Sequence, residues 1–213
     1  MANTELMGLY ASRGGLYTQC ESQGFRRITY CLDRPDVLSI YTVTLRGKAS
    51  EFPTLLSNGN LIKQVTEGEH LVCTWHDPFP KPSYLFALVA ADLQCIEETV
   101  TSASGAQKLL QVYTKAQDIG RADFALQSLK RAVFWDEKRF GLELDLERFM
   151  IVAVPDFNSG PWRTRALTCS TPNMCWRSSD CYRPRPRVGR AVIGHEYSTT
   201  GLATESPVAT GFS

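Results

Sequence analysis

The residues whose spacing most clearly suggests chemistry in this 213-residue chain are His195 and Glu196. The run Val192–Tyr197 resembles the opening of an H-E-x-x-H helix, in which two His at i and i+4 bind zinc and the Glu is the general base. Here the position four residues after His195 is Thr199. A catalytic zinc needs three protein ligands and an open position. We therefore expect His195 alone to hold no zinc.

Net charge and cysteine pattern indicate no further site. The net charge is +1, which does not suggest a nucleic-acid partner or a membrane surface. No apolar run approaches the roughly 18–20 residues of a membrane-spanning helix. The seven cysteines, an odd number, favour reduced thiols in a reducing compartment. Cys169, Cys175 and Cys181 are six residues apart, whereas structural zinc sites usually pair cysteines about two to four residues apart.

The elements that must position these residues begin with β-structure in residues 1–97. Four segments rich in β-branched, aromatic or continuous apolar residues predict strands: Phe25–Cys31, Leu38–Leu45, His70–Trp75 and Tyr84–Ala90. Asp33–Asp36 predicts a turn, and Ser57–Asn60 contains the Asn-Gly pair typical of a hairpin. Asp77–Pro82 predicts a loop, because its three prolines remove donors that a strand ladder needs.

Residues 98–160 combine patterns typical of strands with a pattern typical of a helix. Lys108–Tyr113 and Phe149–Val154 predict strands. Ala122–Phe140 predicts an amphipathic helix with its apolar residues along one stripe. After residue 160 the apolar residues follow neither a helical nor a strand period. Pro161–Arg190 holds four Pro, seven Arg and three Cys. Such a segment buries too little apolar surface to offset the entropy of ordering, which predicts a disordered tail, with an Arg/Pro interaction segment as the alternative.

Many short segments, taken in order, resemble the aminopeptidase N (alanyl aminopeptidase) family of zinc metallo-aminopeptidases, of the gluzincin type, and most closely its bacterial branch. The segments run almost without gaps from about residue 4 to Asn158. They include Tyr17–Glu21 (YTQCE), Gly24–Tyr30 (GFRRITY), Asp33–Val37 (DRPDV), Leu56–Asn60 (LSNGN), Asp77–Pro82 (DPFPKP), Trp135–Glu137 (WDE) and Met150–Val154 (MIVAV).

The resemblance implies a mixed α+β fold in three parts. Residues 1–97 would be the C-terminal part of an all-β saddle domain, and residues 98–160 the start of a thermolysin-like α/β catalytic domain. Residues 161–213 would be a frame-disrupted, disordered tail with a partial zinc-binding motif. We therefore expect further saddle strands before residue 1 and more of the catalytic domain after residue 213.

Shifts of the reading frame in the coding sequence explain the unusual amino-acid sequence of the tail. The family places G-A-M-E-N after Asn158, where this chain has Gly160–Leu167 (GPWRTRAL). The codons GGG CCA TGG AGA ACA AGG GCT TTG encode that run, and reading them two bases later gives Ala-Met-Glu-Asn-Lys-Gly-Phe. In the same way, one added base before Ser198–Leu202 can restore Phe-His-Asn-Trp-Thr and with it a second zinc His.

The resemblance also implies roles for individual residues. His195 would be a zinc ligand and Glu196 the general base, with the second His and the Glu ligand absent from this chain. Gln19 would line the pocket for the first substrate side chain, and Glu21 would hold the substrate's protonated amine, which suits a charge-assisted hydrogen bond. The implied cofactor is zinc, not bound by this chain as written. The implied partners are peptide substrates, without nucleic acid or a membrane segment, and the implied location is cytoplasmic.

Three hypotheses about function remain open at this point. The chain represents a zinc-dependent enzyme that removes N-terminal residues from peptides, with an error in the recorded sequence. Alternatively, the polypeptide exists as written, a non-catalytic remnant of a decayed gene. A third hypothesis is an interaction fragment that uses its Arg/Pro tail. The sequence does not separate these hypotheses, and it leaves the oligomeric state and the preferred substrate side chain open.

Overall fold

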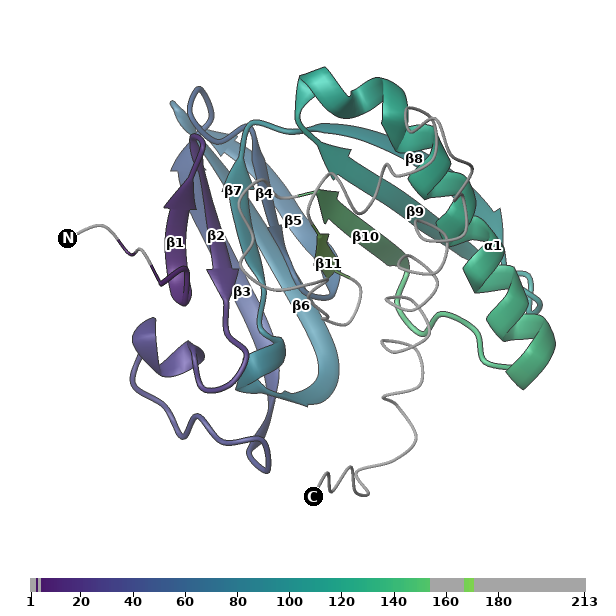
Figure 1. Ribbon diagram of the computed structural model, residues 1–213, viewed down its shortest axis with the longest axis horizontal. Coiled ribbons are helices and arrows are strands. Elements are labelled where there is room, and N and C mark those ends of the chain that lie inside the picture. The colour runs from purple at the N-terminus through teal and green to yellow at the C-terminus, as the bar shows by residue number, and fades with distance from the viewer. Residues whose placement is uncertain (1–2, 4, 154–166, 171–213) are drawn as a thin grey trace, which may run out of the picture.

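The computed structural model describes residues 3, 5–153 and 167–170, and within them it places three β-sheets and one α-helix (Figure 1). The first sheet has the order β1 (Gly8–Ser12), β2 (Gly15–Gln19), β7 (Leu88–Ala91), β4 (Thr54–Ser57). The second has the order β3 (Leu38–Lys48), β6 (His70–Pro82), β5 (Asn60–Glu67). The third has the order β11 (Leu167–Ser170), β10 (Arg148–Ala153), β9 (Gln107–Thr114), β8 (Gln94–Thr101). Short 3-10 helices occupy η1 (Phe25–Arg27), η2 (Ser83–Leu85) and η3 (Ala116–Arg121).

The first and second sheets enclose a hydrophobic core that we call the sandwich core. Its largest side chains include Trp75 from β6 and Tyr17 from β2, which are 2% and 1% exposed. The indole Nε1 of Trp75 donates a hydrogen bond of 3.1 Å to the carbonyl oxygen of Leu55 in β4. This bond satisfies the one polar group of a buried Trp and also ties the second sheet to the first.

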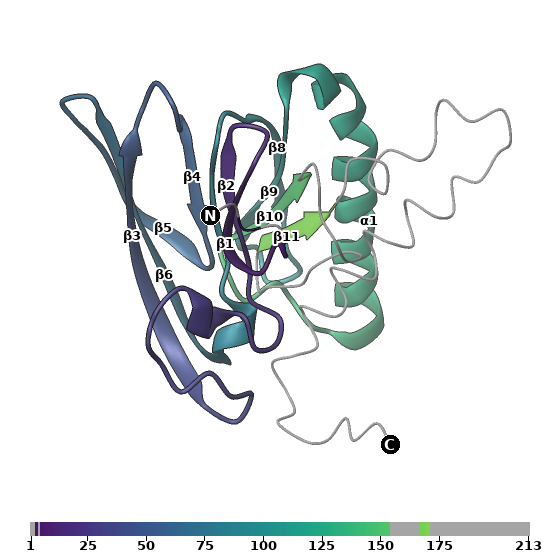
Figure 2. The same cartoon turned by 60° about the vertical axis from the view of Figure 1, so that its left-hand side comes forward.

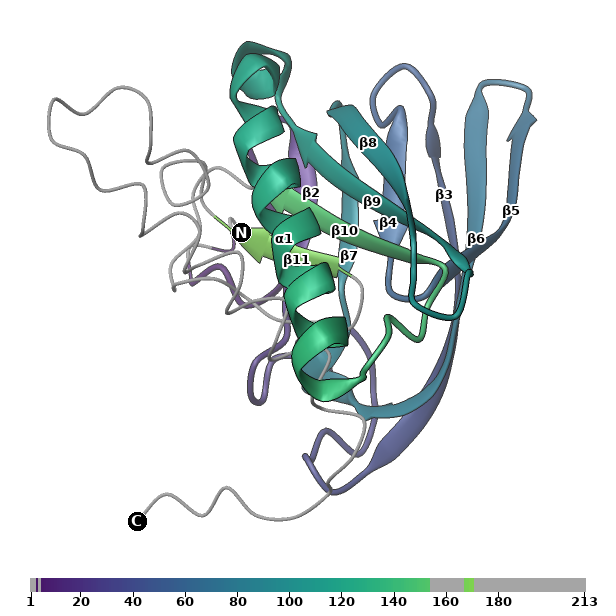
Figure 3. The same cartoon turned by 90° about the vertical axis from the view of Figure 1, so that its right-hand side faces the viewer.

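Helix α1 (Ala122–Phe140) covers one face of the third sheet and forms with it a second core, the helix core (Figure 3). Ala125, Leu129 and Val133 are fully buried, which is the i, i+4, i+8 stripe of an amphipathic helix. Gly141 ends the helix in the left-handed region with φ of 69°, and its N–H donates to Glu137 O at 3.0 Å. The predicted helix is therefore confirmed at both ends.

Strand β10 belongs to both cores because its side chains alternate between the two faces of the third sheet. Met150 and Val152 lie in the sandwich core, whereas Phe149, Ile151 and Ala153 lie in the helix core. Figure 2 shows the resulting succession of layers: second sheet, first sheet, third sheet and α1. A strand that is buried on both faces has a continuous run of apolar residues, and it is this run that predicted the strand.

Two predictions in the first part of the chain are wrong. Phe25–Cys31 forms no strand: it begins with η1 and continues without strand pairing. Asp77–Pro82 is not a loop but the second half of β6, paired with β3 at Asp77, Lys81 and Pro82. The three prolines occupy alternate positions, so their missing donors all fall on one edge of the strand. The pairing of β5 with β6 reaches only to His76, so that edge of β6 has no strand partner after His76 among the described residues.

Two other predictions change in detail. Ser57–Asn60 is not a hairpin turn, since β4 pairs with β7 and β5 pairs with β6, so this turn crosses from the first sheet to the second. Gly59 sits there with φ of 88°, and a Cβ on it would come within 2.2 Å of the carbonyl oxygen of His76. Tyr84–Ala90 divides into η2 and β7 rather than forming one strand.

Most of the tail, including His195 and Glu196, lies outside the described residues. Within it, Leu167–Ser170 forms β11, which pairs in parallel with Met150–Ala153 of β10. The prediction of an unstructured tail missed this strand, because the edge of β10 offers unpaired backbone groups to any neighbouring segment. The mixed α+β class is confirmed, whereas the domain boundary at residue 97 stays a prediction. In the described ranges, no helix is both long and apolar enough to cross a membrane.

Candidate functional site

The site predicted around Gln19 lies at the C-terminal end of β2. Gln19 pairs with Gly8 of β1 on one edge of the strand. On the other edge, the backbone pairing with β7 covers Leu16 and Tyr17. The Thr18 hydroxyl continues this edge: its Oγ1 accepts from Leu88 N at 2.8 Å and donates to Leu88 O at 3.4 Å. The C-terminal end of β2 is thus held on both edges, at Gln19 on one and at Thr18 on the other.

The side chain of Gln19 presents a buried hydrogen-bond acceptor. Gln19 is 7% exposed, and its Oε1 has no hydrogen-bond partner among the residues that the structure describes. Leaving a buried polar atom without a partner costs about 1–3 kcal/mol. Such an atom is either a source of strain or the place where a ligand's donor binds.

The next two residues differ sharply in exposure. Cys20 is fully buried, and burial, helped by the charges of Asp33 and Cys31, raises the pKa of its thiol to about 12. A thiol with that pKa stays protonated at neutral pH and is a poor nucleophile. Glu21 is exposed and lies in the turn that a 3.0 Å hydrogen bond from Gly24 N to Cys20 O closes. The structure therefore puts an exposed carboxylate two residues from a buried acceptor.

The described part of the chain does not fit a zinc ion. Among residues 3 and 5–153, no group of three or more His, Cys, Asp or Glu side chains is placed to hold a metal. His70 and His76, both in β6, are not brought together with other ligands there. The predicted metal ligand His195 and general base Glu196 lie outside this part.

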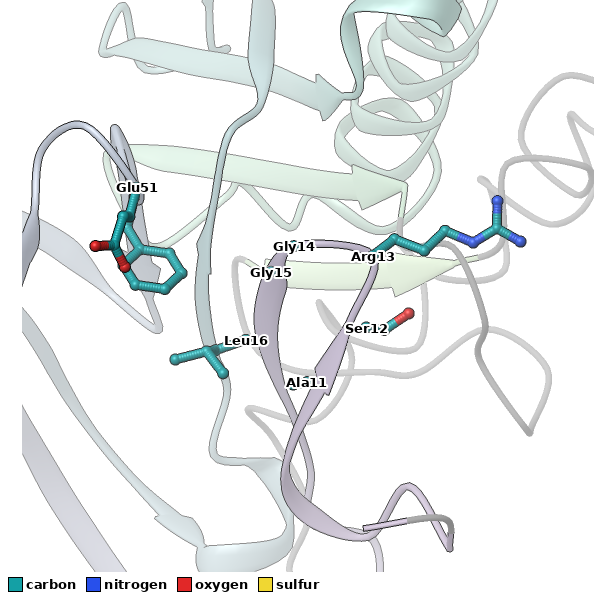
Figure 4. Close-up of a pocket in the computed structure, with 8 residues that line it drawn as sticks. Ala11, Ser12, Arg13, Gly14, Gly15, Leu16 and Glu51 are labelled. Atoms are coloured by element: carbon teal, nitrogen blue, oxygen red, sulfur yellow. The ribbon is translucent and has the colours of Figure 1, made fainter. Parts of the chain in front are cut away.

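A cavity of about 500 Å³ lies elsewhere, at the turn between β1 and β2. Its walls are the turn residues Ala11–Leu16 together with Glu51 and Phe52. In Figure 4, Leu16 lies between the turn and Glu51, and the Arg13 side chain extends away from Glu51. Gln19 is at the opposite end of β2 from this turn, so the cavity contains none of the predicted site residues.

The contacts that hold this region could not be predicted from the sequence. Asp33, predicted as a turn residue, is 3% exposed and accepts hydrogen bonds from Ser83 Oγ at 2.5 Å and from Arg26 N at 2.9 Å. Burial opposes ionisation of Asp33, but the hydrogen bonds from Ser83 and Arg26 outweigh it and lower the pKa. The only signal was a carboxylate in a Pro-containing turn, which is common in exposed turns as well.

Comparison with known proteins gives consistent results. Residues 1–85 match the peptidase M1 N-terminal domain. The chain is 46% identical to aminopeptidase N of Escherichia coli over 199 residues and 51% identical to aminopeptidase N of Caulobacter vibrioides over 201 residues. Each of these alignments covers 92% of this chain and 23% of the relative. The crystal structure of Legionella pneumophila aminopeptidase A in complex with aspartic acid superposes with a TM-score of 0.86 at 34% identity, covering 92% of this chain and 23% of that one. The chain thus spans about a quarter of the length of these relatives.

Proposed function

Because the chain belongs to the aminopeptidase N family of M1 peptidases, we propose that Gln19 and Glu21 recognise the N-terminal residue of a peptide substrate. The observation that carries this proposal is the Oε1 of Gln19, a buried acceptor without a partner among the described residues. A bound peptide's N–H group would satisfy it. The exposed carboxylate of Glu21 would accept a charge-assisted hydrogen bond from the protonated α-amine.

We also propose that the chain is a fragment of a zinc-dependent aminopeptidase, and that the full-length enzyme hydrolyses N-terminal residues from peptides. When bound, zinc would supply a water of lowered pKa. His195 is the one zinc ligand that this chain provides in the family motif, and Glu196 would take a proton from the attacking water. Three protein ligands are needed. We therefore propose that the chain as written binds no stoichiometric zinc and does not hydrolyse peptides. A cytoplasmic location, as the resemblance implies, completes the proposal.

The binding test uses the full chain and L-alanine amide, which carries the α-amine and a small side chain. We expect saturable shifts in the backbone amide NMR signals of residues 18–24, and at least roughly tenfold weaker binding by Glu21→Gln, because a hydrogen bond to a charged group contributes about 1.5–3 kcal/mol. Glu51→Gln, at the distant turn cavity, is the matched control and should bind normally. Absence of saturable binding by the wild-type chain would overturn the recognition site.

The activity test uses the same pure chain with L-alanine p-nitroanilide and added Zn²⁺. We expect no hydrolysis; hydrolysis that a chelator abolishes would overturn the proposed inactivity. The alternative, a non-catalytic remnant or interaction fragment, is separated from the enzyme by resequencing the transcript across codons 155 to 213. A message that restores Gly-Ala-Met-Glu-Asn and a complete H-E-x-x-H motif supports the enzyme, and a message that keeps the shifted frame supports the remnant.

A further inference from the structure

Asp33 is a buried carboxylate in an otherwise exposed segment. Every other residue from Arg26 to Asp36 is exposed, whereas Asp33 is 3% exposed. Its carboxylate accepts from Ser83 Oγ at 2.5 Å, from Arg26 N at 2.9 Å and from Arg26 Nε at 3.4 Å. Its carbonyl oxygen accepts from the Arg26 guanidinium at 3.1 Å. Burying a charged carboxylate is unfavourable unless several hydrogen-bond donors surround it. The hydrogen bonds to Asp33 therefore hold the segment against η1 and η2.

An aromatic contact holds η1, at the start of this segment, at a second point. Phe25, the first residue of η1, packs edge-on against Phe86 with ring centroids 5.0 Å apart, and against Tyr41 at 6.2 Å. Phe86 directly follows η2, the short helix that also carries Ser83. Helix η1 is therefore held against the connection between β6 and β7 by one polar and one aromatic anchor.

Helix η1 is in turn packed against the residues that present Glu21. Gly24, which precedes η1, donates its N–H to Cys20 O at 3.0 Å. A Cβ on Gly24 would come within 2.7 Å of Gln19 O and 2.9 Å of the Cys20 Cα. The backbone of Gly24 thus lies directly on that of Gln19 and Cys20, and Glu21 lies inside the turn that this contact closes. A displacement of η1 would displace Glu21.

We infer that Asp33 is a positioning residue that fixes the turn Cys20–Gly24 and thereby the carboxylate of Glu21. Its link to substrate rests on the proposed recognition of the peptide amine by Glu21. Recognition groups have to be held within about 0.5 Å of their productive geometry. Glu21 is on an exposed turn that cannot supply this rigidity itself. Asp33 supplies it from the interior, through Arg26 and η1.

The test compares the full wild-type chain with Asp33→Asn, which keeps the shape of the side chain and removes its charge. Amide hydrogen exchange is measured at Gly24, whose N–H closes the turn, and at Val112, in the middle of the third sheet. We expect exchange at Gly24 to accelerate at least roughly tenfold while Val112 changes little, since a local opening does not require global unfolding. Unchanged exchange at Gly24, or equal acceleration at both amides, would overturn the inference.

The control variant is Glu98→Gln, which removes the charge partner of Lys130 on the helix side of the molecule. It should leave exchange at Gly24 unchanged. If it accelerated Gly24 as much as Asp33→Asn does, a general loss of stability would explain both results and the inference would fall.

Ligand selectivity then separates this inference from the proposed function. The readout is the ratio of dissociation constants for lactamide, which has a hydroxyl in place of the amine, and L-alanine amide. We expect the wild type to prefer L-alanine amide by roughly tenfold, Glu21→Gln to lose the preference, and Asp33→Asn to reduce it about threefold, because Glu21 keeps its charge but not its position. No preference in the wild type refutes the proposed function, while the exchange data still decide whether Asp33 fixes the turn. A full preference in Asp33→Asn would overturn the role of Asp33 in recognition.

Discussion

The sandwich core and the helix core are stabilised in different ways. Around the sandwich core, buried polar side chains bond to backbone far away in the sequence: Ser57 Oγ donates to Ala87 O at 2.8 Å, and Asn58 Oδ1 accepts from Ala87 N at 2.7 Å. In the helix core, Ser128 Oγ donates to Phe124 O, only four residues away, at 2.7 Å. The sandwich core is thus specified by long-range polar contacts, and the helix core by local apolar periodicity.

The difference explains where a recognition site can be built. Gln19 ends β2, and Glu21 lies in the turn that follows it. Side-chain hydrogen bonds to β7 and to η2 hold this region, so single polar substitutions there should have large local effects. Apart from Phe149, the buried side chains of the helix core are aliphatic, so its stability depends on aliphatic volume. Four single substitutions and one double variant test this contrast.

The largest effect is expected from Lys81→Ala in β6. Lys81 forms an ion pair with Asp77, and the two side chains are 3% and 0% exposed. Removing Lys81 leaves a buried charge without its partner, which costs about 3–5 kcal/mol of unfolding free energy. Urea unfolding measures this loss. The matched control is Lys130→Ala, whose pair with Glu98 is one-third exposed on both sides and should contribute less than about 1 kcal/mol.

A double variant sharpens the same point. Asp77→Leu combined with Lys81→Met removes both charges and should recover most of the lost stability, because buried ion pairs are often replaced by apolar residues at little cost. A double variant as unstable as Lys81→Ala alone would mean that packing, not the unpaired charge, causes the loss.

In the helix core, Leu129→Ala should cost about 2–5 kcal/mol, the usual cost of deleting a fully buried Leu. Leu129 is 0% exposed in the middle of α1. Urea unfolding again gives the value, with the exposed neighbour Arg131→Ala as control, expected within about 0.5 kcal/mol of wild type. A loss below about 1 kcal/mol for Leu129→Ala would show that the helix contributes little to this core.

The same contrast decides how much could be predicted from sequence. Helix α1 and strands β9 and β10 were predicted closely, because their periodicity alone sets which face is buried. Phe25–Cys31 was predicted as a strand from its composition, but it forms η1 and a loop. Phe25 packs against Phe86, and Arg26 bonds to Asp33, which Ser83 in turn holds. Tertiary contacts of this kind override local β-propensity, and no spacing in the sequence reports them.

The candidate site was predictable only in part, and for the same reason. Gln19 and Glu21 were identified through the resemblance of the YTQCE segment, which says nothing about burial. Gln19 Oε1 is buried without a partner among the described residues, and Asp33 is buried against Ser83 of η2. Both features depend on how β2, β7 and η2 meet in space. His195 and Glu196 stay predictions.

A smaller loss is expected from Asn58→Ala in the turn between β4 and β5. Its Oδ1 accepts from Ala87 N at 2.7 Å, and its Nδ2 donates to Leu85 O at 3.2 Å. Truncation leaves a buried N–H unsatisfied, which costs about 1–3 kcal/mol. Chemical denaturation is the measurement, and Gln64→Ala on the exposed side of β5 is the control. Equal effects of the two variants would contradict the role of long-range polar contacts in the sandwich core.

The smallest effect, and a gain rather than a loss, is expected from Asp136→Asn near the C-terminal end of α1. Asp136 is 1% exposed, its Oδ1 has no hydrogen-bond partner within the described part of the chain, and burial raises the pKa of its carboxyl group. The negative end of the helix dipole also disfavours a carboxylate there. Because the folded-state pKa exceeds the unfolded one, the ionised side chain destabilises the fold at neutral pH and ceases to do so below the unfolded pKa of about 3.9.

Asp136→Asn should therefore be more stable than wild type at pH 7, and the gain should shrink toward zero as the pH falls through the raised folded-state pKa to about 3.9. Urea unfolding at several pH values between 3 and 7 measures this dependence. Asp123→Asn, in the exposed first turn of α1, is the control with the opposite sign, since a carboxylate near a helix N-terminus is stabilising by about 0.3–1 kcal/mol. A less stable Asp136→Asn at pH 7 would mean that the Asp136 carboxylate has a partner, and the helix core would then depend on a polar contact as the sandwich core does.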